Sequence, residues 1–171
     1  KAIENGAFAA IVDNKKIAEL NSKCFLVKDV LETLQSLAKY HRNQFKIPVI
    51  AITGSNGKTT TKELTKAILS SKYNIIATKG NFNNHIGVPL TLLQIKKNHS
   101  HALIEMGANH IGEIDFLCKI ANPNYGLITN LGKAHLEGFG SEELILEGKT
   151  ELFKYLENNS GTVFINREDL K

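Results

Sequence analysis

The sequence contains little cysteine, proline or tryptophan, and it has no long hydrophobic run. Among 171 residues there is no tryptophan, and there are only three prolines and two cysteines. Cys24 and Cys118 lie far apart in the sequence, so a disulfide framework is not expected and a reducing, cytoplasmic compartment is favoured. No stretch approaches the roughly 20 apolar residues that a membrane-spanning helix requires. The first residues, "KAIENGAFAAIVDNKK", also lack the basic-then-apolar order of a signal peptide. We therefore expect no membrane insertion.

The charge balance is mildly positive, with a formal net charge of +4. The lysines are dispersed along the chain, and no basic run is interleaved with aromatic residues. Such a distribution is typical of a solvated surface rather than of a nucleic-acid interface, so we expect no nucleic-acid partner. Hydrophobic residues make up 42% of a chain that has about the length of one domain, which is enough to bury a substantial core.

Short apolar runs typical of β-strands alternate with helical patterns. The runs occupy residues 8–13, 47–53, 73–78, 101–106, 125–129 and 161–166. Most are continuous rather than alternating, which indicates strands covered on both faces. The helical patterns occupy residues 29–38, 59–71, 111–120 and 141–156. Asp29 and Ser141 are placed as N-caps, and Glu32 is placed to complete a capping box. From residue 47 onward the repeated order of strand, helix and strand predicts an α/β fold with a doubly wound, mostly parallel sheet.

The stretch "AITGSNGKTT" resembles a phosphate-binding loop with one departure. The common P-loop pattern is G-x-x-x-x-G-K-[ST], and Ile52 stands where its first glycine would be. Strand, glycine-rich turn, Lys-Thr and helix nevertheless follow in the required order. Gly54 and Gly57 allow backbone N–H groups to converge on phosphate oxygens. Lys58 can reach the β- and γ-phosphates, and the Thr59 hydroxyl can ligate Mg²⁺. The loop predicts binding of a nucleoside triphosphate; the alternative is a tight turn with an exposed lysine.

Further polar residues gather in three segments that follow strands, where a doubly wound fold binds its ligands, and in one long helix. They are Asn81, Asn83, Asn84 and His85 in "GNFNNHIGVP", Glu105 in "IEMGANHIGEID", Asn130 and His135 in "ITNLGKAHLEGFGS", and Lys149 in "EGKTELF". Amide groups suit phosphate or acyl oxygens, a strand-end acid can bind Mg²⁺, and a neutral histidine can ligate a metal. The simpler alternatives are an Asn-rich turn, an acid facing solvent, a structural histidine and a solvent-facing lysine.

Taken together, these segments resemble the motifs of the Mur ligases, the ATP-dependent amide-forming enzymes of peptidoglycan synthesis. "TGSNGKTT" is similar to their TG-[TS]-x-GK-[TS] loop, which lacks the usual first glycine. "NNHIGVP" is similar to their N-N-x-x-G-x-P, "EMGANHIGEI" to the segment with their strand-end glutamate, and "TNLGKAHLEGFGS" to their N-x-x-x-x-H-L. The wording of the last two segments is closest to the members that add D-alanyl-D-alanine.

The resemblance implies a domain organisation. "AIENGAFAAIVD" resembles the end of the family's N-terminal UDP-substrate domain, and "VLETLQSLAKYHR" resembles its linker helix. Residues 1–28 would then be the remnant of that small α/β domain, residues 29–46 the linker helix, and residues 47–171 a truncated ATP-binding central domain. Other parts of the family's architecture, including its C-terminal domain, would be missing. We therefore expect the isolated chain to be inactive.

The resemblance also implies roles for individual residues. The nucleotide would be held by Gly54, Ser55, Asn56, Gly57, Lys58, Thr59, Thr60, Asn83 and Asn130. One Mg²⁺ would be bound by Thr59 and Glu105. A second Mg²⁺ would be bound by His135 and by Lys149, the latter as a carbamate. The catalytic set would be Lys58, Asn84, Glu105, His135 and Lys149.

The implied reaction forms an amide bond in two steps, in a bacterial cytoplasm. The terminal carboxylate of UDP-N-acetylmuramoyl-tripeptide attacks the γ-phosphate of ATP, and the amine of D-alanyl-D-alanine then displaces phosphate from the acyl phosphate. Either Asn83 or Asn84 would contact the reacting carboxylate, and we expect a monomer. Three alternatives stay open: another Mur ligase, a folylpolyglutamate synthase, and a P-loop module without ligase activity. The folate enzymes are disfavoured because their loop usually reads GKG, whereas this chain has Thr59 after the lysine.

Overall fold

The computed structural model describes residues 1–132 and 140–166. Its centre is a five-stranded parallel sheet with the strand order β4-β5-β3-β6-β7. The strands are β3 (Val49–Thr53), β4 (Ile75–Ala77), β5 (His101–Glu105), β6 (Tyr125–Ile128) and β7 (Thr162–Phe164). The helices that connect them are α3 (Lys58–Leu69), α4 (Gly87–Leu92), α5 (Glu113–Ala121) and α7 (Glu142–Asn158).

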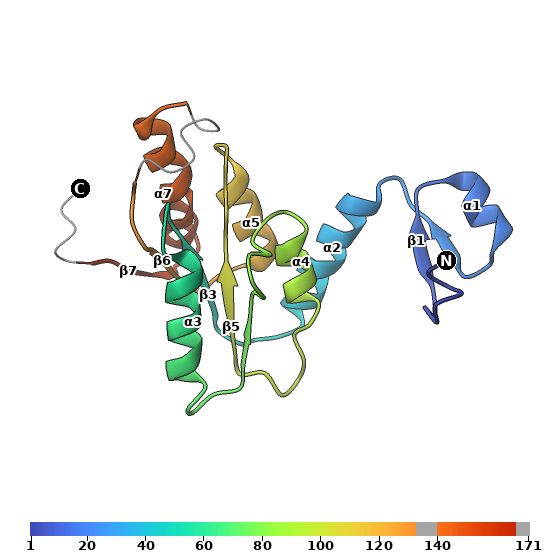
Figure 1. The fold of residues 1–171 in the computed structure, drawn as a ribbon, viewed down its shortest axis with the longest axis horizontal. Helices are drawn as coiled ribbons and strands as arrows, with labels where there is room; N and C mark the ends of the chain where they lie inside the picture. The colour runs from blue at the N-terminus through green and yellow to red at the C-terminus, as the bar shows by residue number, and fades with distance from the viewer. Residues whose placement is uncertain (133–139, 167–171) are drawn as a thin grey trace.

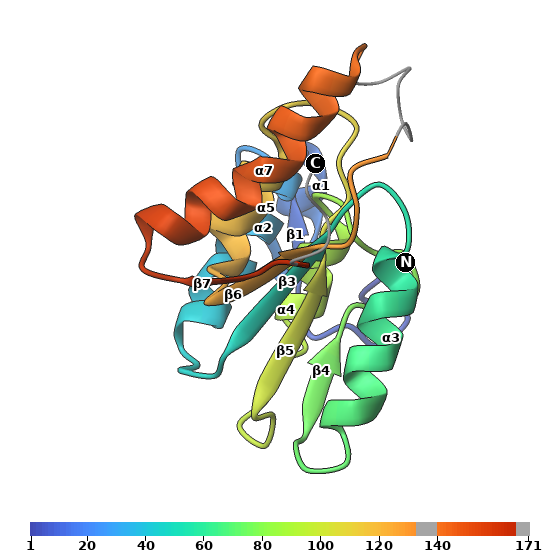
Figure 2. The same cartoon turned by 90° about the vertical axis from the view of Figure 1, so that its left-hand side faces the viewer.

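Helices cover both faces of this sheet. Figure 2 shows α3 on one face and α5 and α7 on the other. The chain also changes direction across the sheet: from β3 it passes over β5 to reach β4, whereas from β5 it passes over β3 to reach β6. In doubly wound folds such a reversal places the ligand site at the C-terminal ends of the two strands concerned. The predicted doubly wound parallel sheet is confirmed, and the loops after β3 and β5 meet at its reversal point.

The predicted helix caps are present. Asp29 Oδ1 accepts a hydrogen bond from the Glu32 backbone N–H at 2.7 Å and starts α2 (Val30–Asn43). Ser141 Oγ accepts from the Leu144 N–H at 3.3 Å and starts α7. The C-terminal end of α5 is capped by Asn122, which takes a left-handed conformation before Pro123. Local sequence signals therefore placed the starts of these helices to within about two residues, whereas α2 runs to Asn43, beyond the predicted end at residue 38.

Two parts of the structure were not assigned from the sequence. Helix α4 begins inside the asparagine segment "GNFNNHIGVP", for which no helix was predicted, and it buries Val88 and Leu92. Near the N-terminus, the apolar run at residues 8–13 correctly predicted β1 (Ala10–Val12), but its parallel partner β2 (Cys24–Leu26) and the connecting α1 (Lys15–Leu20) were not predicted. Both helices have six residues and β2 has three, which is too short for a clear hydrophobic period.

The β1–β2 unit stands apart from the main sheet, and α2 lies between them (Figure 1). Helix α2 is fixed to the main sheet's helices by Arg42, whose side chain is only 4% exposed. The guanidinium donates to the Ala121 and Asn122 carbonyls at the end of α5, at 2.9 and 3.2 Å. It also donates to the Phe45 and Ile47 carbonyls. A cation at a helix C-terminus is stabilised by the helix dipole, so α2 is held firmly beside α5. The domain boundaries at residues 28 and 46 stay predictions.

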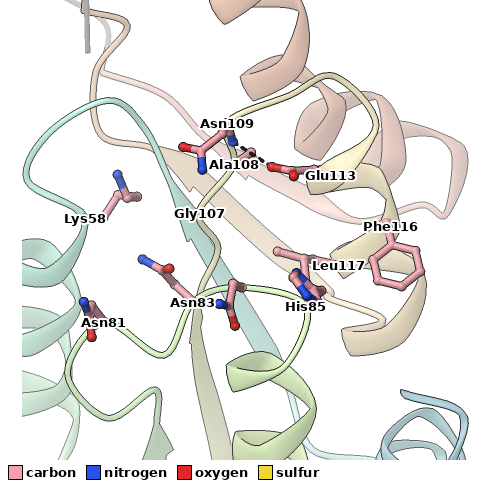
Figure 3. Close-up of a pocket in the computed structure, with 11 residues that line it drawn as sticks. Lys58, Asn81, Asn83, His85, Gly107, Ala108, Asn109, Glu113, Phe116 and Leu117 are labelled. Carbon is pink, nitrogen blue, oxygen red and sulfur yellow. Dashed lines mark hydrogen bonds between the residues drawn. The ribbon is translucent and has the colours of Figure 1, made fainter. Parts of the chain in front are cut away.

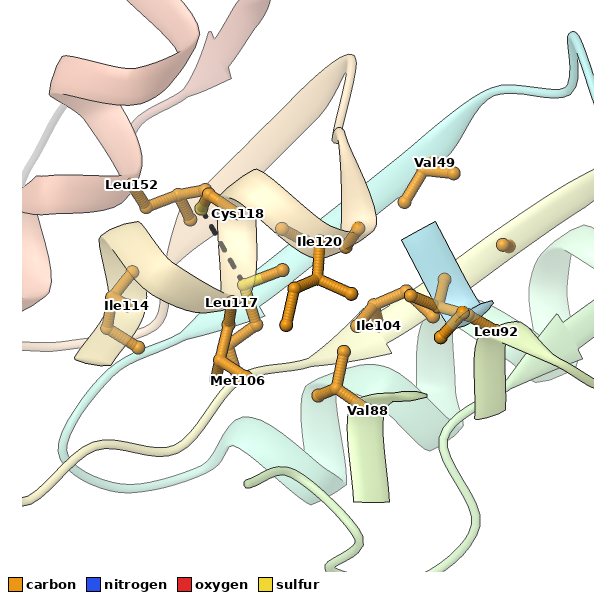
Figure 4. Packing of buried hydrophobic residues seen from close by; sticks show 14 of the residues in the cluster. Val49, Val88, Leu92, Ile104, Met106, Ile114, Leu117, Cys118, Ile120 and Leu152 are labelled. Atoms are coloured by element: carbon orange, nitrogen blue, oxygen red, sulfur yellow. Dashed lines mark hydrogen bonds between the residues drawn. The ribbon is translucent and has the colours of Figure 1, made fainter. Parts of the chain in front are cut away.

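The hydrophobic core fills the space between the sheet and the helices α4, α5 and α7. Figure 4 shows Met106, Leu117 and Leu152 converging there. Cys118 lies among them, and both cysteines are free thiols, as expected. Burial raises the pKa of the Cys118 thiol, because a thiolate would be poorly solvated in this apolar setting. Within residues 1–132 and 140–166, no helix is long and apolar enough to span a membrane.

Candidate functional site

The glycine-rich turn after β3 has the backbone that a phosphate cradle requires. Gly54 has a φ of 139°, and a Cβ atom there would lie 2.0 Å from Thr129 Oγ1, so that no other residue fits. Gly57 has a φ of 76° and is the N-cap of α3. No side chain among the described residues caps this helix. The first N–H groups of α3 are therefore available to an anion, which the helix dipole also favours.

Lys58 is folded back over its own loop. Its Nζ donates to the Gly54 carbonyl at 2.7 Å and to the Ser55 carbonyl at 3.2 Å. Burial lowers the pKa of Lys58, and the nearby Glu105 carboxylate partly opposes this effect. The Lys58 ammonium is thus hydrogen-bonded to carbonyl groups of its own loop, and a bound phosphate could replace these acceptors.

The turn is held from outside by the segment after β6. Asn130 Oδ1 accepts from the Asn56 N–H at 3.0 Å, while Asn130 Nδ2 donates to the Asn56 carbonyl at 3.2 Å. The Ser55 hydroxyl accepts from the Gly132 N–H and donates to the Gly132 carbonyl. Thr129 Oγ1 also donates to the Asn56 carbonyl at 2.6 Å. In this geometry Asn130 positions the loop backbone, and its direct contact with a nucleotide stays a prediction.

Glu105 lies at the end of β5 and is 1% exposed, so the solvent-facing alternative for this acid is wrong. Its Oε1 accepts from Thr59 Oγ1 at 3.1 Å and from Asn83 Nδ2 at 2.8 Å. Its Oε2 accepts no hydrogen bond in the described part of the chain, and Lys62 Nζ lies 3.5 Å away. Thr59 on α3 and Asn83 in the asparagine segment, which were predicted from separate motifs, therefore meet at the carboxylate of Glu105.

The pair formed by Thr59 and Glu105 has the spacing expected of two ligands of one Mg²⁺. Mg²⁺ prefers an octahedral shell with bonds of about 2.1 Å, so neighbouring ligand oxygens lie about 3 Å apart. The distance between Thr59 Oγ1 and Glu105 Oε1 is 3.1 Å. A carboxylate and a hydroxyl are also oxygen ligands of the kind that this ion selects. The two residues thus fit the first predicted metal site.

A cavity of about 410 Å³ opens beside this cluster. Its lining consists of Lys58, Asn81, Asn83, Asn84, His85, Gly107, Ala108, Asn109, Glu113, Phe116 and Leu117. Figure 3 shows Lys58 and Asn83 on one side, and Glu113 and Phe116 on the other. The cavity therefore borders both the phosphate cradle and the predicted asparagine segment, and it is polar at each end.

Asn84 lines this cavity but also shapes it. Its Oδ1 accepts from the Ile86 N–H at 3.1 Å and from the Gly87 N–H at 2.9 Å, which caps the first turn of α4. The neighbouring Asn83 binds Glu105 with its side chain, and its carbonyl accepts from the Gly107 N–H at 2.8 Å. The asparagine segment is therefore an ordered part of the site, whereas the proposed catalytic role of Asn84 stays a prediction.

Lys149 lies on α7 and is fully buried, so the solvent-facing alternative for this lysine is wrong. Its Nζ donates to the carbonyl of Ala108, a residue of the cavity wall, at 3.1 Å. Burial and, to a lesser extent, repulsion from Lys58 lower the pKa of Lys149 to about 8, against the opposing charges of Glu113 and Glu151. A lysine with such a pKa has a substantial neutral fraction near neutral pH.

Three residues of this region were missed by the sequence analysis. Lys62 is fully buried beside Glu105, as described above. Glu113 accepts from the Asn109 N–H at 2.6 Å and from the His110 N–H; burial raises its pKa, but these hydrogen bonds lower it more. Glu151 reaches from α7 to the start of α5, where its carboxylate accepts from two backbone N–H groups. The only available signal was their charge, which is equally typical of exposed helix faces.

The model of the Mur ligase middle domain matches residues 52–171. The chain belongs to the Mur ligase family. It is 45% identical over 150 residues to the UDP-N-acetylmuramoyl-tripeptide–D-alanyl-D-alanine ligase of Bacillus subtilis, an alignment that covers 88% of this chain and 33% of that protein. It is 41% identical over 169 residues to the ligase of the same name from Escherichia coli, with 99% and 37% covered.

Solved structures of this Mur ligase type have the same fold. The crystal structure of MurF from Acinetobacter baumannii matches with a TM-score of 0.83 at 42% identity, over 90% of this chain and 34% of that one. The MurF ligase of Thermotoga maritima, crystallised in complex with ADP, matches with a TM-score of 0.85 at 38% identity, over 99% and 39%. The chain thus spans between a third and two fifths of the proteins it matches.

One predicted functional residue of the Mur ligase pattern, His135, lies outside the described residues. Among the residues that are described, no group of three or more His, Cys, Asp or Glu side chains could hold a metal. The second Mg²⁺ site, which requires His135 and a carbamate on Lys149, is therefore untested. The described part of the site comprises the glycine-rich loop, the pair of predicted Mg²⁺ ligands, the asparagine-lined cavity and the buried lysine.

Proposed function

We propose that this chain is the ATP-binding and carboxylate-activating part of a ligase that adds D-alanyl-D-alanine to UDP-N-acetylmuramoyl-tripeptide. The observation that carries the proposal is the shared cavity: the P-loop lysine Lys58 and the asparagine segment line one space, next to the Thr59–Glu105 pair. A nucleotide and a carboxylate substrate would meet there. The names of the matching ligases support this choice of substrates.

The reaction brings two anions together, so the site must offset their repulsion. The loop amides, the α3 N-terminus and Lys58 would bind the ATP phosphates. Mg²⁺, held by Thr59 and Glu105, would supply positive charge at the transferred phosphoryl group when bound. The tripeptide carboxylate oxygen would attack the γ-phosphorus while ADP leaves. The amine of D-alanyl-D-alanine would then attack the acyl carbon and lose a proton, so that the amide bond forms as phosphate leaves.

Lys149 is the residue that we assign to carbamate formation. The neutral amine would attack the carbon of CO₂ and lose a proton, which gives a carbamate anion that can help His135 to hold a second Mg²⁺. The pKa of about 8 supports this role, since roughly a tenth of the side chains are neutral at pH 7. An ordinary lysine would be neutral in fewer than about one molecule in a thousand.

The remaining features of the proposal follow from the same family pattern. Residues 1–28 would be the end of a UDP-substrate domain, residues 29–46 a linker helix, and residues 47–171 part of the central domain. The protein would act as a monomer in the bacterial cytoplasm. Asn83 and Asn130 would contribute to nucleotide binding, in addition to the loop contacts described above.

The test uses a full-length ligase built around this middle domain. ADP formation from ATP is measured with and without UDP-N-acetylmuramoyl-tripeptide and D-alanyl-D-alanine. We expect ADP only when the tripeptide is present. We expect Lys149→Ala to lose at least about 100-fold in rate, since residues that merely hydrogen-bond a metal's ligands are already worth about 10- to 100-fold. Lys154→Ala, an exposed lysine on the same helix, is the matched control and should be unaffected. ADP formation that never depends on the tripeptide would instead indicate a nucleotide-binding module without ligase activity.

A further inference from the structure

Lys62 is a buried cation for which the proposed reaction has no use. It lies on α3 and is fully buried, and its Nζ is 3.5 Å from Glu105 Oε2. The same ammonium donates to the Gly80 carbonyl at 2.9 Å. Its other neighbour is Glu63 Oε1 at 3.1 Å, on a side chain that is 54% exposed. Burying a lysine costs free energy unless its charge is matched, so its place beside a buried acid calls for an explanation.

The two oxygens of Glu105 face different neighbours. Oε1 faces Thr59 and Asn83, the side on which the predicted Mg²⁺ ligands meet. Oε2 faces Lys62. The Glu105 carboxylate is therefore neutralised by the buried Lys62, on the side away from Thr59 and Asn83. Glu63 adds a negative charge to this group, but because that side chain is exposed, solvent and salt screen it from the interior.

Lys58 adds a second positive charge close enough to the Glu105 carboxylate for the two to interact electrostatically. A lone Mg²⁺ would thus approach one buried carboxylate that already has two lysines near it. A nucleotide brings several negative charges to the P-loop, so the net charge that an approaching Mg²⁺ meets changes from positive to negative. We propose that Lys62 suppresses Mg²⁺ binding to the nucleotide-free site, so that the ion binds together with the nucleotide's phosphates. This inference rests on the proposed nucleotide site.

The experiment measures how strongly one ligand changes the affinity for the other. Mg²⁺ is titrated calorimetrically into the full chain, first alone and then with saturating ADP, and the ratio of the two dissociation constants is the coupling factor. In Lys62→Met we expect Mg²⁺ alone to bind more tightly, so that the coupling factor falls by about tenfold, within the usual range of coupling between sites. Lys66→Met removes an exposed lysine of the same helix and should leave the factor unchanged.

Two further variants separate charge from structure. Lys62→Gln removes the charge but can still donate to the Gly80 carbonyl, so it should reproduce the effect of Lys62→Met even if the methionine variant does not fold. Lys62→Arg keeps the charge and should retain the coupling factor. If Lys62→Gln weakens Mg²⁺ binding equally with and without ADP, Lys62 is only structural and the inference is wrong. If the unmodified chain shows no coupling between Mg²⁺ and ADP, the proposed nucleotide site itself is wrong.

Discussion

The two buried lysines of the site, Lys62 on α3 and Lys149 on α7, show how surroundings decide what one side chain can do. Both are fully buried. Lys62 faces a buried carboxylate oxygen at 3.5 Å. Lys149 donates to a backbone carbonyl, and among the described residues the largest charge effect on it is repulsion from Lys58. The environment of Lys149 lowers its pKa, so this amine loses its proton more readily than an ordinary lysine does.

The comparison of Lys62 with Lys149 shows two different roles that a lysine can have near a phosphate-binding site. An ion-paired lysine adjusts the charge of a metal ligand without touching the nucleotide. A lysine with a lowered pKa is reactive, because only the unprotonated amine is a nucleophile. The difference arises from elements on opposite faces of the sheet, which Figure 2 shows as α3 and α7.

The largest expected effect comes from removing the carboxylate partner of Lys62. In Glu105→Gln the lysine stays buried but loses its buried counter-ion, and we expect the free energy of unfolding to fall by about 3 kcal/mol. Urea unfolding followed by circular dichroism measures this change. A loss below about 1 kcal/mol would show that Glu63 and the Gly80 carbonyl are sufficient partners, which would weaken the contrast with Lys149.

An intermediate effect is expected from the titration of Lys149. Its pKa is lowered in the folded state, so between about pH 8 and the ordinary value of 10.5 the unfolded chain binds more protons. The free energy of unfolding should therefore rise with pH across this window, by about 2 kcal/mol. Unfolding in CO₂-free buffer at pH 8 and pH 10, compared with Lys149→Met, isolates the contribution of this group. Equal pH dependence in the two proteins would contradict the assigned pKa.

The smallest effect is expected from the exposed partner of Lys62. Glu63→Gln removes an acid that lies closer to Lys62 than Glu105 does, at 3.1 Å against 3.5 Å. Because Glu63 is half exposed, its ion pair is screened, and the change in unfolding free energy should stay below about 1 kcal/mol. The same urea assay measures it. A cost equal to that of Glu105→Gln would mean that burial does not decide which of these two ion pairs contributes more to stability.

The fold was predictable because its signals are local. Continuous apolar runs identified the five strands of the sheet, and Asp29 and Ser141 marked two helix starts. The P-loop was recognised from glycine spacing and from the strand and helix around it. Shorter elements such as α4 were missed, since six residues carry too little periodicity.

Helix α3 shows why part of the site was not predictable. Its hydrophobic residues Leu64 and Ile68 are 61% and 71% exposed, whereas Lys62 is fully buried. A sequence pattern assigns lysines to the solvent face and leucines to the core. The chain instead places a charged group inside, because the opposing strand ends in Glu105 and supplies the matching charge.

The sequence by itself determined the alternating strands and helices and the glycine-rich loop, and it predicted Thr59 and Glu105 as site residues. These depend on residue type, spacing and immediate neighbours, whereas Lys149 was predicted only through the resemblance to the Mur ligases. Only the tertiary structure decided which lysines are buried, which oxygen of Glu105 faces which partner, and that Asn130 holds the loop. Such properties depend on burial and on charges tens of residues away along the chain, which meet only when the sheet has formed.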